Sequence, residues 1–206
     1  EIIDILAKDQ QIKTYYYDQD FEIILDEETG DFDLRFADQI LENLKKPSLS
    51  GSHQYINAAT AIATILTLQD QFNISKNHIN QALQNIKWPS RLEKIKGNLN
   101  NLLRNPESEI FIDGAHNESG AFALANWIKE ENEKDLKETY VICGFSKGKC
   151  RAEFLNKFTN IAKIIAVRVD GEPYPEEVNS ISNIAKSSNI EIIESTTLFD
   201  AISDIS

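Results

Sequence analysis

The sequence predicts an α/β protein in two parts, and two patterns of residues support that prediction. Short β-branched and aromatic segments fill residues 12–36, whereas strand-like and helix-like segments alternate regularly from residue 109 onward. The dipeptide Trp88-Pro89 separates the two patterns, because a proline excludes continuation of the preceding helix. A chain of 206 residues, 41% hydrophobic and 26% charged, suffices for one large globular domain or two small ones.

The first part is predicted to begin with antiparallel hairpins and to end with two helices. The strand candidates are residues 12–17, 21–26 and 31–36, which turn residues separate. An Ala-, Ile-, Leu- and Thr-rich helix is expected over residues 53–72, with Ser50, Gly51 and Ser52 as cap candidates. It is apolar on most faces, so we expect it to be buried against a sheet. A second helix is expected over residues 75–86, with Ser75 as its N-cap.

The second part is predicted to form a mostly parallel sheet covered by helices. The strand candidates are residues 109–113, 139–144, 162–169 and 190–195, and the helix candidates are 118–131, 151–160 and 176–187. A further helix starts at Thr197, and the expected last strand is absent from the sequence. Alternation of strand and helix implies right-handed crossovers and a parallel sheet. We place the boundary near residues 87–92, which gives domains of residues 1–88 and 89–206.

Charge and hydropathy exclude several classes of function. The chain has 21 basic and 33 acidic residues, a net charge of −12, and no basic block. This balance argues against binding to nucleic acid or to a membrane surface, since both require a cationic footprint. The longest apolar stretch, Ile56 to Leu68, is interrupted by three threonines and is too short to span a bilayer.

The two cysteines, Cys143 and Cys150, flank a stretch that resembles a phosphate-binding loop only superficially. The stretch is "CGFSKGKC", whereas a P-loop requires a wider glycine spacing and a hydroxyl residue after the lysine. No other stretch matches, so no P-loop is predicted. Two cysteines are too few for a disulfide framework or a four-cysteine zinc site, and their spacing suits no redox pair. We expect reduced, buried bystander thiols in a cytoplasmic protein.

The stretch "FIDGAHN" places polar residues at the end of a predicted strand. Asp113 ends the strand, Gly114 permits close backbone approach, and His116 and Asn117 precede a helix. Ligands of doubly wound folds bind at such strand ends. An aspartate there can accept from ribose hydroxyls, and a histidine can donate to a phosphate oxygen. The alternative is that Asp113 and Asn117 merely cap the helix, and position alone does not decide between the two.

Two earlier stretches carry further candidates for nucleotide binding. In "SGSHQYINAATAIA", His53 and Asn57 lie four positions apart and share one face at the start of the predicted helix. An asparagine amide suits the N6/N7 edge of adenine. In "WPSRLE", Arg91 offers a guanidinium fork for phosphate. The alternatives are polar residues that complete a first helical turn, and a surface ion pair between Arg91 and Glu93.

Taken in order, "SLSGSHQYINAATAIA", "WPSRLEKI", "FIDGAHN" and "CGFSKGKC" resemble the C-terminal half of the folylpolyglutamate synthase/dihydrofolate synthase family. This family is part of the Mur ligase superfamily, and the HQ and DGAHN sequences are similar to its folate branch rather than to the peptidoglycan ligases. The resemblance covers nearly the whole chain. It implies that residues 1–88 are the C-terminal part of a P-loop-type central ATPase domain. Residues 89–206 would then form a Rossmann-like, mostly parallel C-terminal domain.

The resemblance implies an ATP-dependent ligase with Mg²⁺ as a further cofactor. The carboxylate of folate or dihydropteroate would be phosphorylated by ATP, and the amine of L-glutamate would attack the acyl phosphate. Asn57, together with His53, would bind the adenine end of ATP, and Arg91 would reach its phosphates. Asp113 and His116 would close over the nucleotide. Arg91 and His116 would be the catalytic residues, because a cation and a donor stabilise the transferring phosphoryl group.

Three departures from the family pattern shape the expectations for this chain. Ser90 stands where the family usually has glycine, a mild change if the local φ is negative. Cys150 stands where an aspartate usually follows the lysine. The P-loop and the magnesium-binding residues lie upstream in the family and are absent here.

We therefore expect residues 1–206 to be an incomplete portion that cannot turn over ATP alone. The missing N-terminal segment would be a partner, and the complete protein is expected to be a monomer. The alternatives are another Mur-type acid–amino-acid ligase and a non-catalytic nucleotide-binding remnant.

Overall fold

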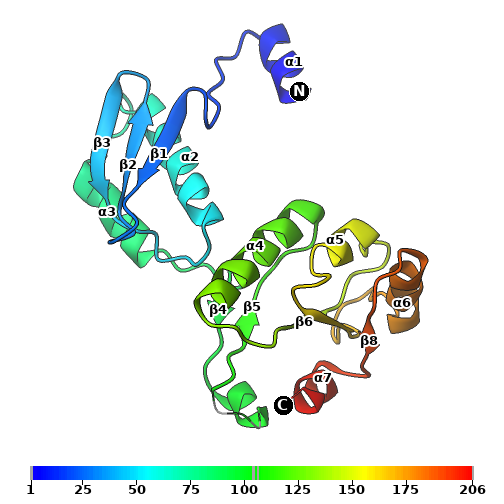
Figure 1. Ribbon diagram of the computed structural model, residues 1–206. Coiled ribbons are helices and arrows are strands. Elements are labelled where there is room, and N and C mark those ends of the chain that lie inside the picture. Colours follow the sequence, from blue (N-terminus) through cyan, green and yellow to red (C-terminus); the bar gives the residue numbers. More distant parts are fainter. Residues whose placement is uncertain (1, 104, 106, 206) are drawn as a thin grey trace. The chain divides into compact units, whose positions relative to one another are not determined.

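The computed structural model describes residues 2–103, 105 and 107–205, and it divides the chain into two compact units. Unit 1 comprises Glu1–Trp88 and unit 2 comprises Pro89–Ser206 (Figure 1). Each unit has its own sheet and its own buried core. Within the described residues, no helix is long and apolar enough to cross a membrane.

Unit 1 is an antiparallel three-stranded sheet with two of its three helices packed on one face (Figure 1). Its elements are α1 (Ile2–Asp9), β1 (Phe21–Leu25), β2 (Phe32–Phe36), β3 (Gln39–Leu44), α2 (His53–Thr67) and α3 (Lys76–Asn85), with the strands in the order β1-β2-β3 (Figure 1). Phe32, Leu34 and Phe36 alternate along β2 and are 1%, 0% and 8% exposed, so they mark the buried face. They form one core with residues of α2 and α3, including Ile62 and Leu83.

The predicted strands at 21–26 and 31–36 are confirmed, but the strand predicted at residues 12–17 is wrong. That segment makes only an isolated bridge, between Tyr17 and Phe21. Its aromatic rings pack on the core instead: the ring centroids of Tyr15 and Phe36 lie 5.0 Å apart. The helix α1 and the strand β3 were not predicted, and β3 reads "QILENL", which lacks the aromatic enrichment typical of strands.

Both predicted helices of unit 1 are present. Ser75 caps α3 as predicted: its hydroxyl accepts the His78 backbone N–H at 3.4 Å, and its own N–H donates to His78 Nδ1 at 3.3 Å. Ser52 precedes α2 with helical backbone angles and makes no side-chain cap bond. Helix α2 ends at Thr67 rather than at residue 72.

Unit 2 alternates strands and helices as predicted. Its elements are β4 (Glu93–Lys94), η1 (Asn98–Leu102), β5 (Phe111–Ile112), α4 (Glu118–Lys134), β6 (Tyr140–Cys143), α5 (Ala152–Asn156), β7 (Lys163–Ala166), α6 (Val178–Ser187), β8 (Ile193–Glu194) and α7 (Leu198–Asp204). Strands β6, β7 and β8 form a parallel sheet in that order. Ile164 and Ala166 of β7 join the core with α4, α5 and α6, whereas Ile165 packs on the other face with Ala201 of α7. The sheet is therefore covered on both faces.

The strand predicted at residues 109–113, which is β5, does not pair as the alternation of strands and helices suggested. Among the described residues, β5 pairs with β4 in an antiparallel ladder, with Glu93 opposite Ile112 and Lys94 opposite Phe111. It is not hydrogen-bonded into the parallel sheet. This pairing brings the segment that follows Pro89 to the strand end that carries "FIDGAHN".

Candidate nucleotide-binding site

The segment after Pro89 and the loop after β5 are joined by two hydrogen bonds, one between backbone groups and one from a backbone N–H to a carboxylate. The Gly114 N–H donates to the Ser90 carbonyl at 2.8 Å, and the Leu92 N–H donates to Asp113 Oδ2 at 3.0 Å. We call these four residues, Ser90, Leu92, Asp113 and Gly114, the clasp. Leu92 and Asp113 are 21 positions apart in the sequence, so the clasp unites two stretches that were noticed separately.

Asp113 uses both carboxylate oxygens within the protein. Besides the bond from Leu92, Asp113 Oδ1 accepts the Ala115 N–H at 2.8 Å. Asp113 is half-buried at this position. The helix cap is Asn117 alone, whose side chain accepts the Gly120 N–H at 2.9 Å, so the capping interpretation holds for Asn117. A contact between Asp113 and a ribose stays a prediction.

Arg91 is displayed between two residues of unusual backbone conformation. Ser90 has φ 59° and Leu92 has φ 46°, both in the left-handed region. The condition for a mild glycine-to-serine change, a negative φ at Ser90, is therefore not met. A Cβ built on Gly114 would lie 3.8 Å from Arg91 Nη1, which places the guanidinium beside the loop.

The guanidinium of Arg91 is available to an anion. In the described part of the chain Arg91 makes no ion pair. The alternative pairing with Glu93 is not formed, because Glu93 Oε2 accepts the Ser90 backbone N–H at 3.0 Å. Arg91 is exposed.

His116 also lies close to Gly114. Its Nδ1 is 2.9 Å from the Gly114 carbonyl oxygen, and the residue is exposed. A carbonyl partner fixes the proton on Nδ1, so the neutral ring offers an acceptor at Nε2. Donation from Nε2 to a phosphate oxygen therefore requires the imidazolium form.

In unit 1, His53 and Asn57 are linked by a residue that sequence reasoning missed. Gln54 is 6% exposed, and its amide nitrogen lies 2.8 Å from His53 Nε2. Its amide oxygen accepts from Asn57 Nδ2 at 3.1 Å. In the sequence, Gln54 contributes only to the resemblance to the folate branch, through the pair His53-Gln54, and nothing there indicates its hydrogen bonds. Because Gln54 is buried, it holds the exposed Asn57 side chain at the start of α2.

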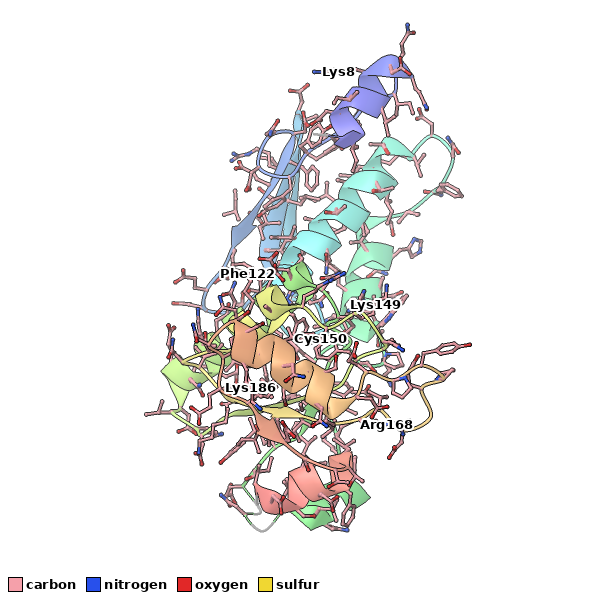
Figure 2. All side chains as sticks on the ribbon, turned by 90° about the vertical axis from the view of Figure 1, so that its right-hand side faces the viewer. Lys8, Phe122, Lys149, Cys150, Arg168 and Lys186 are labelled. Carbon is pink, nitrogen blue, oxygen red and sulfur yellow. The ribbon has the colours of Figure 1, made fainter. Side chains whose placement is uncertain are left out.

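The loop after β6 does not cradle a phosphate with its backbone. The N–H groups of Lys147, Gly148 and Lys149 donate to the Tyr174 carbonyl at 2.7 Å, to Glu176 Oε2 at 2.6 Å and to the Ser146 carbonyl at 3.0 Å. These three amides are therefore engaged within the protein. The Lys149 side chain projects from the loop and is exposed (Figure 2).

Glu176, another residue that the sequence did not single out, anchors this loop. It is 8% exposed, and its own N–H donates to the Phe145 carbonyl at 2.7 Å. The pKa of the Glu176 carboxyl lies below its ordinary value, because the Gly148 N–H and, secondarily, the Ser180 side chain stabilise the charged form.

The two cysteines are buried thiols, as predicted. Burial raises the pKa of the Cys143 thiol to about 12 and that of Cys150 to about 11. Both therefore stay protonated at neutral pH and are poor metal ligands or nucleophiles. Among the described residues, no group of three or more His, Cys, Asp or Glu side chains could hold a metal ion.

Comparison with known proteins covers one of the two stretches that the clasp joins, the loop after β5. Residues 94–180 match the family model described as "Dihydrofolate synthetase, C-terminal domain". The chain is 31% identical over 101 residues to the dihydrofolate synthase/folylpolyglutamate synthase of Bacillus subtilis, a match that covers 48% of this chain and 21% of that protein. Residues 94–180, less than half of the chain, are therefore similar to the C-terminal domain of dihydrofolate synthetases.

Solved structures of such synthases share the fold of this portion. Folylpolyglutamate synthase from Thermotoga maritima has a TM-score of 0.64 and 26% identity, and the match covers 94% of this chain and 44% of that chain. The Mycobacterium tuberculosis folylpolyglutamate synthase, solved with ADP and AMPPCP, has a TM-score of 0.77 at 19% identity, and the match covers 99% of this chain and 45% of that chain. The latter likeness shows the fold alone.

The match spans only part of each synthase. The chain covers 22% of the probable dihydrofolate synthetase of Schizosaccharomyces pombe, to which it is 28% identical over 103 residues. The family model includes Asp113 and His116 but begins after Arg91. A Yersinia pestis folylpolyglutamate synthase/dihydrofolate synthase, 16% identical to this chain, was solved with Mn, AMPPNP and L-glutamate bound to it.

Proposed function

We propose that this chain forms the C-terminal part of an ATP-dependent ligase that joins L-glutamate to folate or dihydropteroate. The observation that carries the proposal is the meeting of "WPSRLE" and "FIDGAHN" at one strand end of unit 2. There the exposed Arg91 guanidinium and the His116 imidazole both lie close to Gly114. Two cationic or donor groups beside an open glycine suit a phosphate group.

The proposed reaction has two steps. The substrate carboxylate attacks the γ-phosphorus of ATP, which releases ADP and leaves an acyl phosphate. The glutamate amine then attacks the acyl carbon, expels phosphate and gives up a proton, so that an amide bond replaces the C–O bond. Arg91 and protonated His116 would stabilise the negative charge that the transferring phosphoryl oxygens carry in the first step.

In unit 1, we assign the adenine end of the nucleotide to the group formed by His53, Gln54 and Asn57. Gln54 orients Asn57 through its amide oxygen, so the Asn57 amide is held in one rotamer. A fixed asparagine amide offers a donor and an acceptor together, which matches the adenine N6/N7 edge. Loss of Gln54 is therefore expected to weaken adenine recognition through Asn57.

The described residues contain no group of three or more His, Cys, Asp or Glu side chains that could hold Mg²⁺. Following the resemblance to the synthases, of which this chain covers less than half, we assign the P-loop and the magnesium ligands to an N-terminal segment outside residues 1–206. We take the complete protein to be a cytoplasmic monomer. Residues 1–206 alone are expected to be inactive.

Phosphate release with ATP and L-glutamate tests the proposal. Phosphate release by the complete protein should require folate or dihydropteroate, and the Arg91→Ala variant should lose it. The 1–206 chain alone should release no phosphate. Folate-dependent turnover by the isolated 1–206 chain would contradict the assignment of the P-loop and the magnesium ligands to a separate N-terminal segment. Turnover with a UDP-muramoyl substrate instead of folate would identify another Mur-type ligase. ATP binding without turnover would identify a non-catalytic remnant.

A further inference from the structure

We propose that Tyr55 is a positioning residue for Asn57, because it ties the first turn of α2 to the turn between β1 and β2. The Tyr55 hydroxyl donates to the Gly30 carbonyl at 2.8 Å, across 25 positions of sequence. We call this hydrogen bond the tether. The first turn of α2 carries His53, Gln54 and Asn57, the group to which adenine is assigned. The effect of the tether on a nucleotide rests on the proposed function, whereas the tether itself does not.

Tyr55 lies on the face of α2 that packs on the sheet, whereas Asn57 lies on the opposite face. Successive helical residues are about 100° apart, so Tyr55 and Asn57 are separated by about 200° around the helix axis. The Tyr55 ring packs edge-on against Phe32 with ring centroids 5.6 Å apart, and Phe32 is 1% exposed on the buried face of β2. Asn57 is exposed. Tyr55 therefore acts on a ligand of Asn57 through the helix and not by contact with that ligand.

The first turn of α2 begins without a side-chain N-cap in the part of the chain that the structure describes. Ser52 precedes it with helical backbone angles, whereas α3 begins with the reciprocal bonds between Ser75 and His78. The first N–H groups of a helix have no partner within the helix, so an uncapped first turn frays readily. The Tyr55 hydroxyl lies in this turn, and the tether therefore supplies a restraint that a cap would otherwise give.

The turn that receives the Tyr55 hydroxyl is held on both sides of the accepting carbonyl. The Gly30 N–H donates to the Asp26 carbonyl at 2.8 Å. The next residue, Asp31, accepts the Lys46 backbone N–H at 3.0 Å. Gly30 has φ 74°, and a Cβ built on it would lie 3.3 Å from the Tyr55 hydroxyl oxygen, so glycine permits both the turn and the close approach. Burial raises the pKa of the Tyr55 hydroxyl, which therefore stays a protonated donor at neutral pH.

Amide hydrogen exchange in the 1–206 chain tests the tether. The backbone N–H groups of Gln54 and Tyr55 donate to the Gly51 and Ser52 carbonyls at 3.0 and 3.2 Å, so they report on the first turn of α2. Tyr55→Phe removes only the hydroxyl and keeps the ring in place. Exchange at these two amides, corrected for intrinsic rates, should become about 3- to 10-fold faster, as expected for the loss of one hydrogen bond.

Thr64→Val is the matched control in the same helix. The Thr64 hydroxyl also donates to a backbone carbonyl, that of Thr60 at 2.8 Å, but it lies beyond the first turn. The control should leave exchange at the Gln54 and Tyr55 amides unchanged. Equal exchange at these amides in Tyr55→Phe and the wild-type chain would overturn the tether.

The link to Asn57 is tested by the affinities of the complete protein for ATP and GTP. Adenine presents a donor at N6 beside the acceptor N7, whereas guanine presents two acceptors, O6 and N7. An Asn57 amide held in one orientation therefore prefers adenine. Tyr55→Phe should lower the ratio of ATP affinity to GTP affinity about 3- to 10-fold, and Thr64→Val should not change it. In the Asn57→Ala background, Tyr55→Phe should leave this ratio unaltered.

The outcomes separate the positioning role from the proposed function. An unchanged ratio in Tyr55→Phe would overturn the positioning role, even if the first turn of α2 exchanges faster. A ratio that falls equally in the Asn57→Ala background would also overturn it, because Tyr55 would then act independently of Asn57. If the complete wild-type protein does not bind ATP, the proposed function fails, and the exchange measurement alone decides whether the tether exists.

Discussion

Replacing Ser90 with glycine is expected to stabilise unit 2, because the φ of 59° at this position strains any side chain. A residue with a Cβ in the left-handed region is destabilised by roughly 1–2 kcal/mol. Glycine also lowers the unfolding free energy by about 0.4–1 kcal/mol, because it increases the conformational entropy of the unfolded chain. The net expectation is a gain of about 0.5–1 kcal/mol, or roughly 2–4 °C in melting temperature.

Tryptophan fluorescence measures this change in unit 2 alone. The Trp127 ring packs against Phe111 with ring centroids 4.8 Å apart, so its emission reports whether this part of unit 2 is folded. Trp88 is 62% exposed and can be replaced by phenylalanine to remove its background. Urea titration of the W88F chain with and without Ser90→Gly then gives the difference in unfolding free energy.

Ser188→Gly provides a matched control in the same unit. Ser188 follows α6 with φ −113°, where glycine relieves no strain and only increases the entropy of the unfolded chain. This control is expected to lose about 0.5–1 kcal/mol. If Ser90→Gly loses stability to the same extent as Ser188→Gly, the backbone at position 90 is not strained, and the reasoning about the clasp loses its basis.

Three further changes have defined outcomes. Asn117→Ala removes the N-cap of α4 and should reduce the unfolding free energy of unit 2 by about 1 kcal/mol in urea titration. Gly144→Ala would place a Cβ 2.6 Å from Val169 Cγ2 and should cost about 1–3 kcal/mol in the same assay. The lowered pKa of Glu176 means that its stabilisation is fully present above its ordinary pKa of 4.5 and is lost as pH falls through the lower folded-state pKa. Exchange at the Gly148 amide, corrected for intrinsic pH dependence, should rise in that acid range, and a flat response would contradict the anchor.

The sequence predicted those features that local periodicity and capping encode. The alternation of strand and helix after residue 109 and the Ser75 cap both depend on neighbours within a few positions. The β4–β5 pairing does not, because its partners approach through tertiary hydrogen bonds across a long loop. The aromatic run at 12–17 shows the same limit: its composition favours a strand, but its rings are used to cover the core.

Within the site, the sequence identified residue types but not their roles. Arg91, Asp113 and His116 were all candidates for the nucleotide, yet only contacts distinguish an available side chain from one engaged by the backbone. The sign of φ at Ser90 was left open, since it follows from the clasp rather than from the residue. Gln54 and Glu176 escaped notice because a buried hydrogen-bonding role has no periodic signature.

The use of carboxylates as backbone acceptors would allow a chain with a net charge of −12 to offer the proposed site to an anion. Asp113 of the clasp and the neighbouring Glu93 each accept backbone N–H groups, and among the described residues neither forms an ion pair with Arg91. Had either carboxylate turned to Arg91, the ion pair would have closed the site to phosphate. Local hydrogen bonding, rather than overall charge, therefore decides what this strand end attracts.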